Sequence, residues 1–253
     1  MELKFLEELL HDTSKLLKDS FGGRYKVQVK KDHTLVTDVD LKSDRFVRNV
    51  LGKNFPDDEI MTEEADFLSD REEGRGVWIV DPLDGTSNFA HGYPFFCVSI
   101  AKGFFDSRGH IHVLFGGVAN PLSGEIFIGA RGQGAFLGDE RLSVRSEPLE
   151  SNLFCAMSDF EGEGLDAMKA GWSFRKDGAI ALDLALVSRG TFDGFWGRSL
   201  KPWDIAAGAL LISEAGGVVR SMEVEETFHI ECGSLLCGAP QGVGEISQYF
   251  GLT

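Results

Sequence analysis

Five acidic residues stand where apolar strands end or helices begin, and their spacing points to cation chemistry. In the stretch WIVDPLDGTSNF, Asp81 and Asp84 follow an apolar run that predicts a buried strand, and a glycine turn comes directly after. The other acids are Asp40, Glu63 and Asp204. Carboxylates that converge on one crevice repel each other unless cations lie between them. Mg²⁺ accepts carboxylate oxygens together with waters and substrate phosphate, so these acids predict a magnesium site.

The pair Gly85-Thr86 supplies a second kind of group beside these acids. Glycine lets the backbone approach a ligand closely, because it carries no side chain. If Thr86 opens a short helix or turn, free backbone N–H groups point at an anion there. A phosphate held beside the cations would make the site that of a phosphate-ester hydrolase, in which the cations stabilise the attacking and leaving oxygens.

Four segments carry a resemblance to a known family. They are KKDHTLVTDVD, MTEEAD, DPLDGTSNF and PWDIAAGALLISEAGG. The last two look like the signature motifs of the inositol monophosphatase family of Mg²⁺-dependent, lithium-sensitive sugar phosphatases. The four segments follow the family's order over nearly the whole chain. Either signature is fairly specific alone, and together they make a chance match improbable.

The resemblance implies a role for each acid in binding two or three Mg²⁺ ions. Glu63, Asp81 and the backbone carbonyl of Leu83 would hold the first ion. Asp81, Asp84 and Asp204 would hold the second, so Asp81 would bridge the two. A third, weaker ion would lie near Glu63 through water.

The resemblance also implies the groups that handle water and phosphate. Asp40 and Thr86 would form a hydrogen-bonded pair that, with Glu63, orients and deprotonates the attacking water. The backbone amides of Gly85 and Thr86 would hold phosphate oxygens. The second metal would stabilise the leaving oxygen, so direct in-line hydrolysis would need no protein general acid.

A lysine of the family's mobile loop also has a counterpart. Lys30 matches it by its K-x-D-x-T-x-V-T context, and the neighbouring Lys31 is the alternative.

Substrate contacts are expected from the C-terminal part, where GAIALDLA resembles the family's G-[ST]-A-A-x-D/N stretch. The implied substrate-binding residues are Gly178, Ala179, Ile180, Asp183 and Arg198, with Arg175 as a further candidate for an anionic substrate. Ala179 replaces the usual hydroxyl residue, and Ile180 replaces an alanine. Gly197 stands where many inositol phosphatases have a glutamate that binds sugar hydroxyls. A site that lacks such a partner discriminates less between substrates.

The substrate therefore stays open between an inositol monophosphate or a related sugar or polyol phosphate and several alternatives. These are histidinol phosphate, fructose 1,6-bisphosphate, a nucleotide 3′-phosphate and NADP. A binding or regulatory protein that kept the fold and lost turnover is the competing hypothesis from another class. The complete acid set argues against it, because closely packed carboxylates are tolerated only with cations.

Hydrophobic spacing predicts the elements that must position these residues. Leucines recur at helical spacing between Leu3 and Leu17, and Gly22-Gly23 ends the pattern. A second helix is expected from about Leu41 to Leu51, and a short strand at 59–62. Apolar runs at 96–104, 111–119 and 125–129 predict an antiparallel sheet. The segments GAIALDLALV and PWDIAAGALLISE predict two further helices.

Mixed helix and strand patterns favour an α+β first part, residues 1–150, and an α/β second part, residues 151–253. The resemblance implies the layered α-β-α-β-α sandwich of the inositol monophosphatase and fructose-1,6-bisphosphatase type, and a homodimer. The net charge of −15 argues against non-specific binding to nucleic acid or an anionic membrane. Scattered cysteines, the acidic N-terminus and the lack of a long apolar run favour a cytoplasmic protein with reduced thiols.

Overall fold

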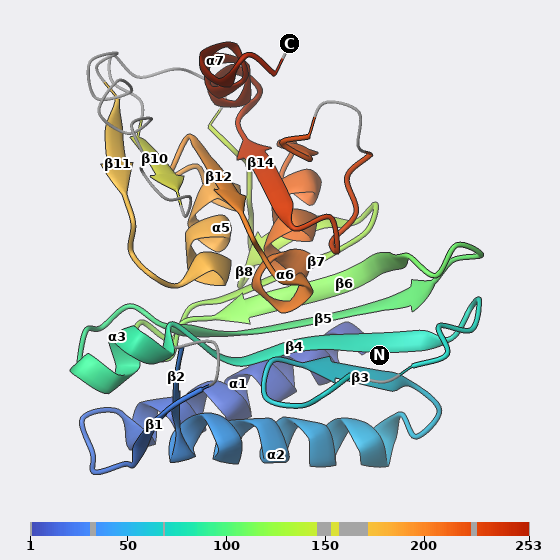
Figure 1. Ribbon diagram of the computed structural model, residues 1–253, viewed down its shortest axis with the longest axis vertical. Helices are drawn as coiled ribbons and strands as arrows, with labels where there is room; N and C mark the ends of the chain where they lie inside the picture. The colour runs from blue at the N-terminus through green and yellow to red at the C-terminus, as the bar shows by residue number, and fades with distance from the viewer. Residues whose placement is uncertain are drawn as a thin grey trace.

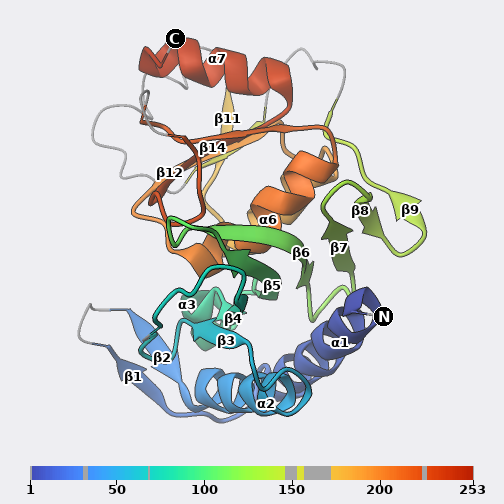
Figure 2. The ribbon, with the colours of Figure 1, turned by 90° about the vertical axis from the view of Figure 1, so that its right-hand side faces the viewer.

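The computed structural model describes residues 2–30, 34–67, 69–145, 153–156, 172–223 and 227–252. Its outer layer consists of two long helices, α1 (Glu2–Ser20) and α2 (Asp38–Asn54), which lie side by side (Figures 1 and 2). Both are amphipathic, and their apolar faces pack on one face of a large sheet. A small antiparallel hairpin of β1 (Val27–Val29) and β2 (Leu35–Thr37) connects them.

The large sheet forms the second layer, with the strand order β3-β4-β5-β6-β7-β8-β9 in the described residues. The strands are β3 (Glu59–Thr62), β4 (Gly76–Asp84), β5 (Cys97–Phe105), β6 (Ile111–Ala119), β7 (Ile126–Ala130), β8 (Gly134–Leu137) and β9 (Glu140–Arg141). β3 and β4 are parallel, and the following neighbours are antiparallel. A short helix, α3 (Thr86–His91), follows β4.

Two largely apolar helices form the middle layer, between the two sheets. α5 (Ile180–Ser188) and α6 (Pro202–Glu214) pack against each other and against the inner face of the large sheet. Because both their faces meet protein, they are buried almost all round, and they contribute to the largest apolar cluster of the described chain.

A second, smaller sheet covers these helices, with the order β11-β10-β12-β14-β13. Its strands are β10 (Leu153–Ala156), β11 (Ser173–Arg175), β12 (Gly194–Arg198), β13 (Val218–Arg220) and β14 (Ser234–Gly238). β11, β10 and β12 are parallel, whereas β14 runs antiparallel to β12 and β13. The last helix, α7 (Pro240–Phe250), forms the outermost layer at the top of Figure 1.

This arrangement confirms the predicted α-β-α-β-α sandwich. The strands of the antiparallel sheet and the helices α1, α5 and α6 also lie where the hydrophobic patterns predicted them. The predicted start of the second helix at Leu41 was wrong by three residues. Thr37 and Asp40 form a capping box, which satisfies N–H groups of the first turn and lets the helix begin at Asp38. The predicted division at residue 150 stays a prediction, because residues 146–152 lie outside the described part.

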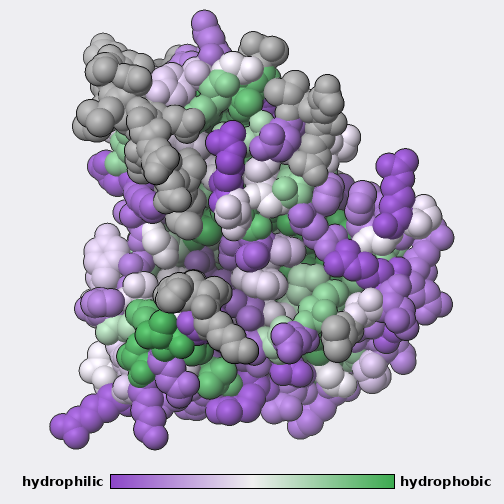
Figure 3. Space-filling view, viewed as in Figure 1, coloured by the Kyte–Doolittle hydropathy of each residue, from purple (hydrophilic) through white to green (hydrophobic). Residues whose placement is uncertain are grey.

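Hydrophilic side chains cover most of the face shown in Figure 3. Hydrophobic side chains gather at its lower left, over the β1–β2 hairpin, where Val27 and Val29 are exposed. In the described part of the chain, no helix is both long and apolar enough to cross a membrane.

Candidate active site

The end of β4 carries the two acids of the DPLDGT stretch. Asp81 and Asp84 are 2% and 7% exposed. The pairing of β4 with β5 is regular up to Asp81 and shifts before Asp84 pairs with Cys97. Pro82 lies in this irregular stretch, since proline has no N–H to give to a ladder. The irregularity ends the strand just before the turn at Gly85.

Each of these acids accepts a backbone hydrogen bond that fixes its direction. Oδ1 of Asp81 accepts the N–H of Leu83, at 3.0 Å. Oδ2 of Asp84 accepts the N–H of Ala181 in the first turn of α5, at 2.7 Å. An acid at a helix N-terminus is stabilised by the helix dipole and by the unpaired N–H groups there. Asp84 therefore joins the large sheet to the middle helix layer.

The acids raise each other's pKa values. Burial is the largest cause for Asp81, and the charges of Glu63, Asp84 and Asp204 add to it, so its pKa lies well above the usual range. Burial and the neighbouring Asp204 raise the pKa of Asp84 to about 7. Burial also raises the pKa of Asp204 to about 7, although Oδ2 of Asp204 accepts the N–H of Lys201 at 2.7 Å. The four acids are thus close enough in space to repel one another.

Lys30 provides the positive charge on this cluster. Its Nζ lies 2.7 Å from Oε1 of Glu63 and 2.8 Å from Oε1 of Glu64. Burial alone would lower the pKa of Lys30, but the two carboxylates raise it above its ordinary value. The side chain of Glu64 is only 4% exposed, and burial raises its pKa to about 7. Lys31, the alternative loop lysine, lies outside the described residues.

Gly85 and Thr86 form the predicted turn into a helix. Gly85 has φ of +90° and is the N-cap of α3, which begins at Thr86. The Oγ1 of Thr86 lies 2.6 Å from Oδ1 of Asp40 and 3.2 Å from the carbonyl oxygen of Leu83. Asp40 is 1% exposed. The expected hydrogen-bonded pair of Asp40 and Thr86 is therefore present.

The predicted substrate segment lies directly against this turn. A Cβ on Gly85 would meet the Cβ of Ala179 and the carbonyl oxygen of Phe95 at 3.1 Å, and the carbonyl oxygen of Gly178 at 3.3 Å. Ile180 and Asp183, at the start of α5, are buried. Backbone contact between the two halves of the chain is thus close enough to require glycine at position 85.

Asn88 stabilises the same contact, and the sequence motif alone indicates no role for it. Its Nδ2 donates to the carbonyl of Phe95 and to the carbonyl of Asp177, both at 2.7 Å. It therefore holds the segment that precedes Gly178 against α3. Its place in the DGTSNF motif was the available signal, but the partner at Asp177 could be found only in three dimensions.

Arg198 is in a different environment from the acids. Its side chain is 42% exposed, and its Nε lies 3.7 Å from Oε1 of Glu223. Arg175 is exposed and donates to the carbonyl of Phe174. Among the described residues, the structure gives neither arginine a contact with the acid cluster.

The donor set fits a hard divalent cation. The groups are carboxylate and carbonyl oxygens, which Mg²⁺ prefers. Burial first, and the neighbouring carboxylates second, raise the pKa of three of these acids, and a bound cation would offset both effects. In the described part of the chain, no three His, Cys, Asp or Glu side chains already enclose an ion position. Local partners explain this, because Glu63 is turned to Lys30, and Asp84 and Asp204 to backbone N–H groups.

Comparisons with known proteins place this geometry in context. A model of the inositol monophosphatase family matches residues 2–247. The Nus factor SuhB of Pseudomonas aeruginosa is 38% identical over 230 residues, which cover 83% of this chain and 82% of that protein. The inositol-1-monophosphatase of Rhizobium meliloti is 36% identical over 248 residues, which cover 93% and 91%. The solved structure of an IMPase from Thermotoga maritima has a TM-score of 0.87 at 31% identity, and covers 99% of this chain and 96% of that one.

Proposed function

The chain belongs to the inositol monophosphatase family, and we propose that it is a Mg²⁺-dependent phosphatase of a small phosphate monoester, an inositol monophosphate or a related sugar or polyol phosphate. The observation that carries the proposal is the cluster of Glu63, Asp81, Asp84 and Asp204 beside the Gly85-Thr86 turn. A purely structural role would not account for four mutually repelling acids at a turn that presents backbone N–H groups.

In this proposal, Glu63, Asp81, Asp84, Asp204 and the carbonyl of Leu83 hold the cations. Bound there, the ions would stabilise the negative charge that develops on the attacking and leaving oxygens of the phosphate ester.

The remaining groups bind and orient. The N–H groups of Gly85 and Thr86 donate to phosphate oxygens, because the first N–H groups of a helix have no partner within it. Thr86 donates its hydroxyl hydrogen to Asp40, so its oxygen lone pairs can accept a hydrogen bond from a water. That water is thereby oriented toward the phosphorus, and Glu63 is the nearby carboxylate proposed to take its proton.

Lys30 has two proposed tasks. Its contact with Glu63 and Glu64 offsets their negative charge when no cation is bound. With Glu63 holding a cation, the ammonium group of Lys30 would be available to bind the phosphate.

Substrate choice is proposed to lie with Gly178 and Ala179, which lie against the Gly85 turn, and with Ile180 and Asp183 at the start of α5. The bulky Ile180 and the small Gly197 differ from the usual inositol-reading residues. The alternatives of histidinol phosphate, fructose 1,6-bisphosphate, a nucleotide 3′-phosphate or NADP therefore belong in the same test. Because one relative is named a Nus factor, a non-catalytic, regulatory role is the second candidate function.

The test is phosphate release by the purified protein from a panel of these esters, with and without Mg²⁺ and Li⁺. We expect one ester to be hydrolysed well ahead of the others, only with Mg²⁺, and less with Li⁺. Asp84→Asn is the blank, because it keeps the side-chain shape and removes one proposed ligand charge. Turnover of no ester by a folded, Mg²⁺-binding protein would favour the regulatory candidate. Light scattering on the same sample tests the proposed homodimer.

A further inference from the structure

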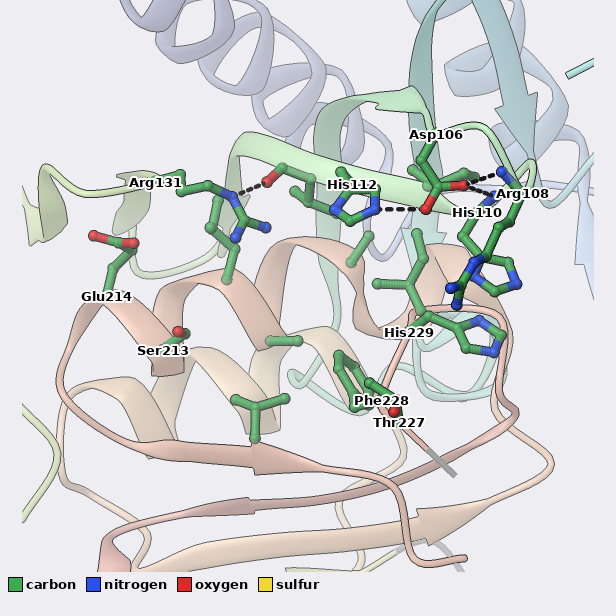
Figure 4. A pocket seen from close by; sticks show the side chains of 17 residues that line it. Asp106, Arg108, His110, His112, Arg131, Ser213, Glu214, Thr227, Phe228 and His229 are labelled. Atoms are coloured by element: carbon green, nitrogen blue, oxygen red, sulfur yellow. Dashed lines mark hydrogen bonds and ion pairs between the residues drawn. The ribbon is translucent and has the colours of Figure 1, made fainter. Parts of the chain in front are cut away.

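A cavity opens near the tip of the β5–β6 hairpin, and along α6 it extends to Ala206, two residues after Asp204 of the acid cluster. It has a volume of about 480 Å³, within the range of small-molecule sites. Its walls are the tip of the β5–β6 hairpin, α6 from Ala206 to Glu214 and the segment 227–230 (Figure 4). Asp84 pairs with Cys97 at one end of β5, whereas the cavity begins beyond Phe105 at the other end. Eight residues of strand separate the two places, which corresponds to about 25 Å.

The floor of the cavity is apolar and its rim is rich in hydrogen-bond donors. Ala206 and Leu210 of α6, Val113 and Phe228 line the floor. Side chains around the rim include two arginines and three histidines: Arg108, Arg131, His110, His112 and His229. Two acids, Asp106 and Glu214, stand on the same rim.

The two acids on the rim already have backbone or side-chain partners. Oδ1 of Asp106 accepts the N–H groups of Arg108 and His110, and its Oδ2 lies 2.9 Å from Nε2 of His112. The two carboxylate oxygens of Glu214 accept the N–H groups of Gly132 and Gly134, each at 2.8 Å. Both carboxylates are thus engaged in hydrogen bonds to nearby turns.

The guanidinium groups of Arg108 and Arg131 make fewer hydrogen bonds than these carboxylates do. Arg131 donates from Nε to the carbonyl of Val113 at 2.9 Å. Within the described residues, the structure gives its other N–H groups no partner, and the side chain of Arg108 has none there. Guanidinium N–H groups bind carboxylates and phosphates through paired hydrogen bonds.

The walls are held together without a ligand. Arg71 donates to the carbonyl of Gly109 at 3.0 Å and forms an ion pair with Glu231 at 2.7 Å. It therefore fastens the hairpin tip to the chain just after segment 227–230. The rings of His110 and His229 stack across the same junction, with centroids 4.4 Å apart and an interplanar angle of 4°. Pre-formed walls reduce the entropy lost on binding.

We propose that this cavity binds a small organic anion, a carboxylate or phosphate group carried on an apolar body of about ring size. Arg108, at one end of the cavity, binds the anionic group, and the apolar body packs on Leu210 and Phe228, while Arg131 lies at the other end. The end of the cavity that carries Arg108 lies at the opposite end of β5 from Asp84, and binding there does not require the chain to be catalytic.

The test uses phenylphosphonate as the probe, because its P–C bond resists hydrolysis. Protein freed of metal on a chelating resin is titrated and followed by calorimetry, since a cation-free acid cluster repels anions. Benzoate, inorganic phosphate and benzyl alcohol are titrated in parallel. We expect saturable binding of phenylphosphonate, of benzoate or of both, weaker binding of inorganic phosphate, and none of benzyl alcohol. Which of the two ring anions binds more tightly identifies the anionic group.

Variants locate the binding. Arg108→Ala is expected to raise the dissociation constant about fivefold to tenfold, because it removes a charged hydrogen-bond donor at a partly exposed site. Arg45→Ala is the matched control, since Arg45 is exposed on α2, on the opposite side of the large sheet. Equal affinity in Arg108→Ala and wild type would overturn the proposal, as would the absence of saturable binding. Tighter binding on addition of Mg²⁺, unchanged by Arg108→Ala, would also overturn it and place the anion at the acid cluster.

Discussion

Removing the charge of Asp84 should stabilise the metal-free protein at neutral and alkaline pH. The pKa of this buried carboxyl is raised from 3.8 to about 7, chiefly by burial and then by Asp204. The folded state thus binds the proton more tightly than the unfolded chain does. The resulting cost to stability is absent below about pH 4, grows between pH 4 and pH 7, and is complete above pH 7.

The size of the effect follows from the shift. Three pKa units at 1.36 kcal/mol each correspond to about 4 kcal/mol, which is an upper limit. Asp81 and Asp204 share the repulsion, so protons redistribute among the three acids and reduce the cost. We therefore expect Asp84→Asn to raise the free energy of unfolding by about 1–3 kcal/mol at pH 8. An asparagine oxygen can still accept the N–H of Ala181, so the cap on α5 is retained.

The assay is urea unfolding of resin-treated protein at pH 5 and pH 8, followed by circular dichroism. The gain should shrink at pH 5, where Asp84 in the wild type is largely protonated. Asp139→Asn is the matched control, because Asp139 is an exposed acid in a turn. Added Mg²⁺ should reverse the order of the two proteins, since a ligand that binds only the folded state stabilises it. A metal-free Asp84→Asn protein that is less stable than wild type at pH 8 would refute the reasoning.

Three further predictions concern the turn after β4. Gly85→Ala should lower the free energy of unfolding in thermal melts by about 1–3 kcal/mol, because an alanine there would have a positive φ and contacts at 3.1 Å. Gly124 has φ of +78° and open space around it, so Gly124→Ala measures the cost of the positive φ alone. Thr86→Val should reduce kcat at least about 100-fold in phosphate-release assays, whereas Thr86→Ser should retain activity; equal activity of both would contradict the role of the hydroxyl. Asn88→Ala should cost about 1–3 kcal/mol in urea unfolding, because two carbonyl groups lose their donor, while Asn54→Ala, at an exposed site, should cost less.

The parts of the site that lie within one segment were predictable from the sequence. An apolar run that ends in acids and a Gly-Thr turn defines a strand, its end and a helix start, because each step is a local preference. The cap formed by Thr37 and Asp40 was equally local. The pattern T-D-V-D before an apolar-periodic segment shows why the helix begins at Asp38.

The parts that depend on distant segments were not predictable in this way. Asn88 binds the carbonyl of Asp177, and Lys30 binds Glu63 and Glu64, across long stretches of chain. The cavity has no sequence motif, because its basic residues come from three distant segments, the β5–β6 hairpin, Arg131 after β7, and His229. Composition does not show where such residues meet. The packing of the β5–β6 hairpin and of segment 227–230 around α6 brings these residues together.

Asp84 links the end of the large sheet to α5. Its carboxylate stands at the end of the large sheet, yet one of its oxygens accepts an N–H group from the first turn of α5. The turn of α5 offsets part of the cost of burying the charge, and the acid satisfies a donor that the helix cannot satisfy itself. Gly85 and Asn88 add close contacts to Gly178 and Asp177 at the same place. A shift of α5 would therefore move a proposed cation ligand, the phosphate turn and the substrate segment together. Substrate contacts and cation binding are for this reason expected to be coupled through the N-terminus of α5.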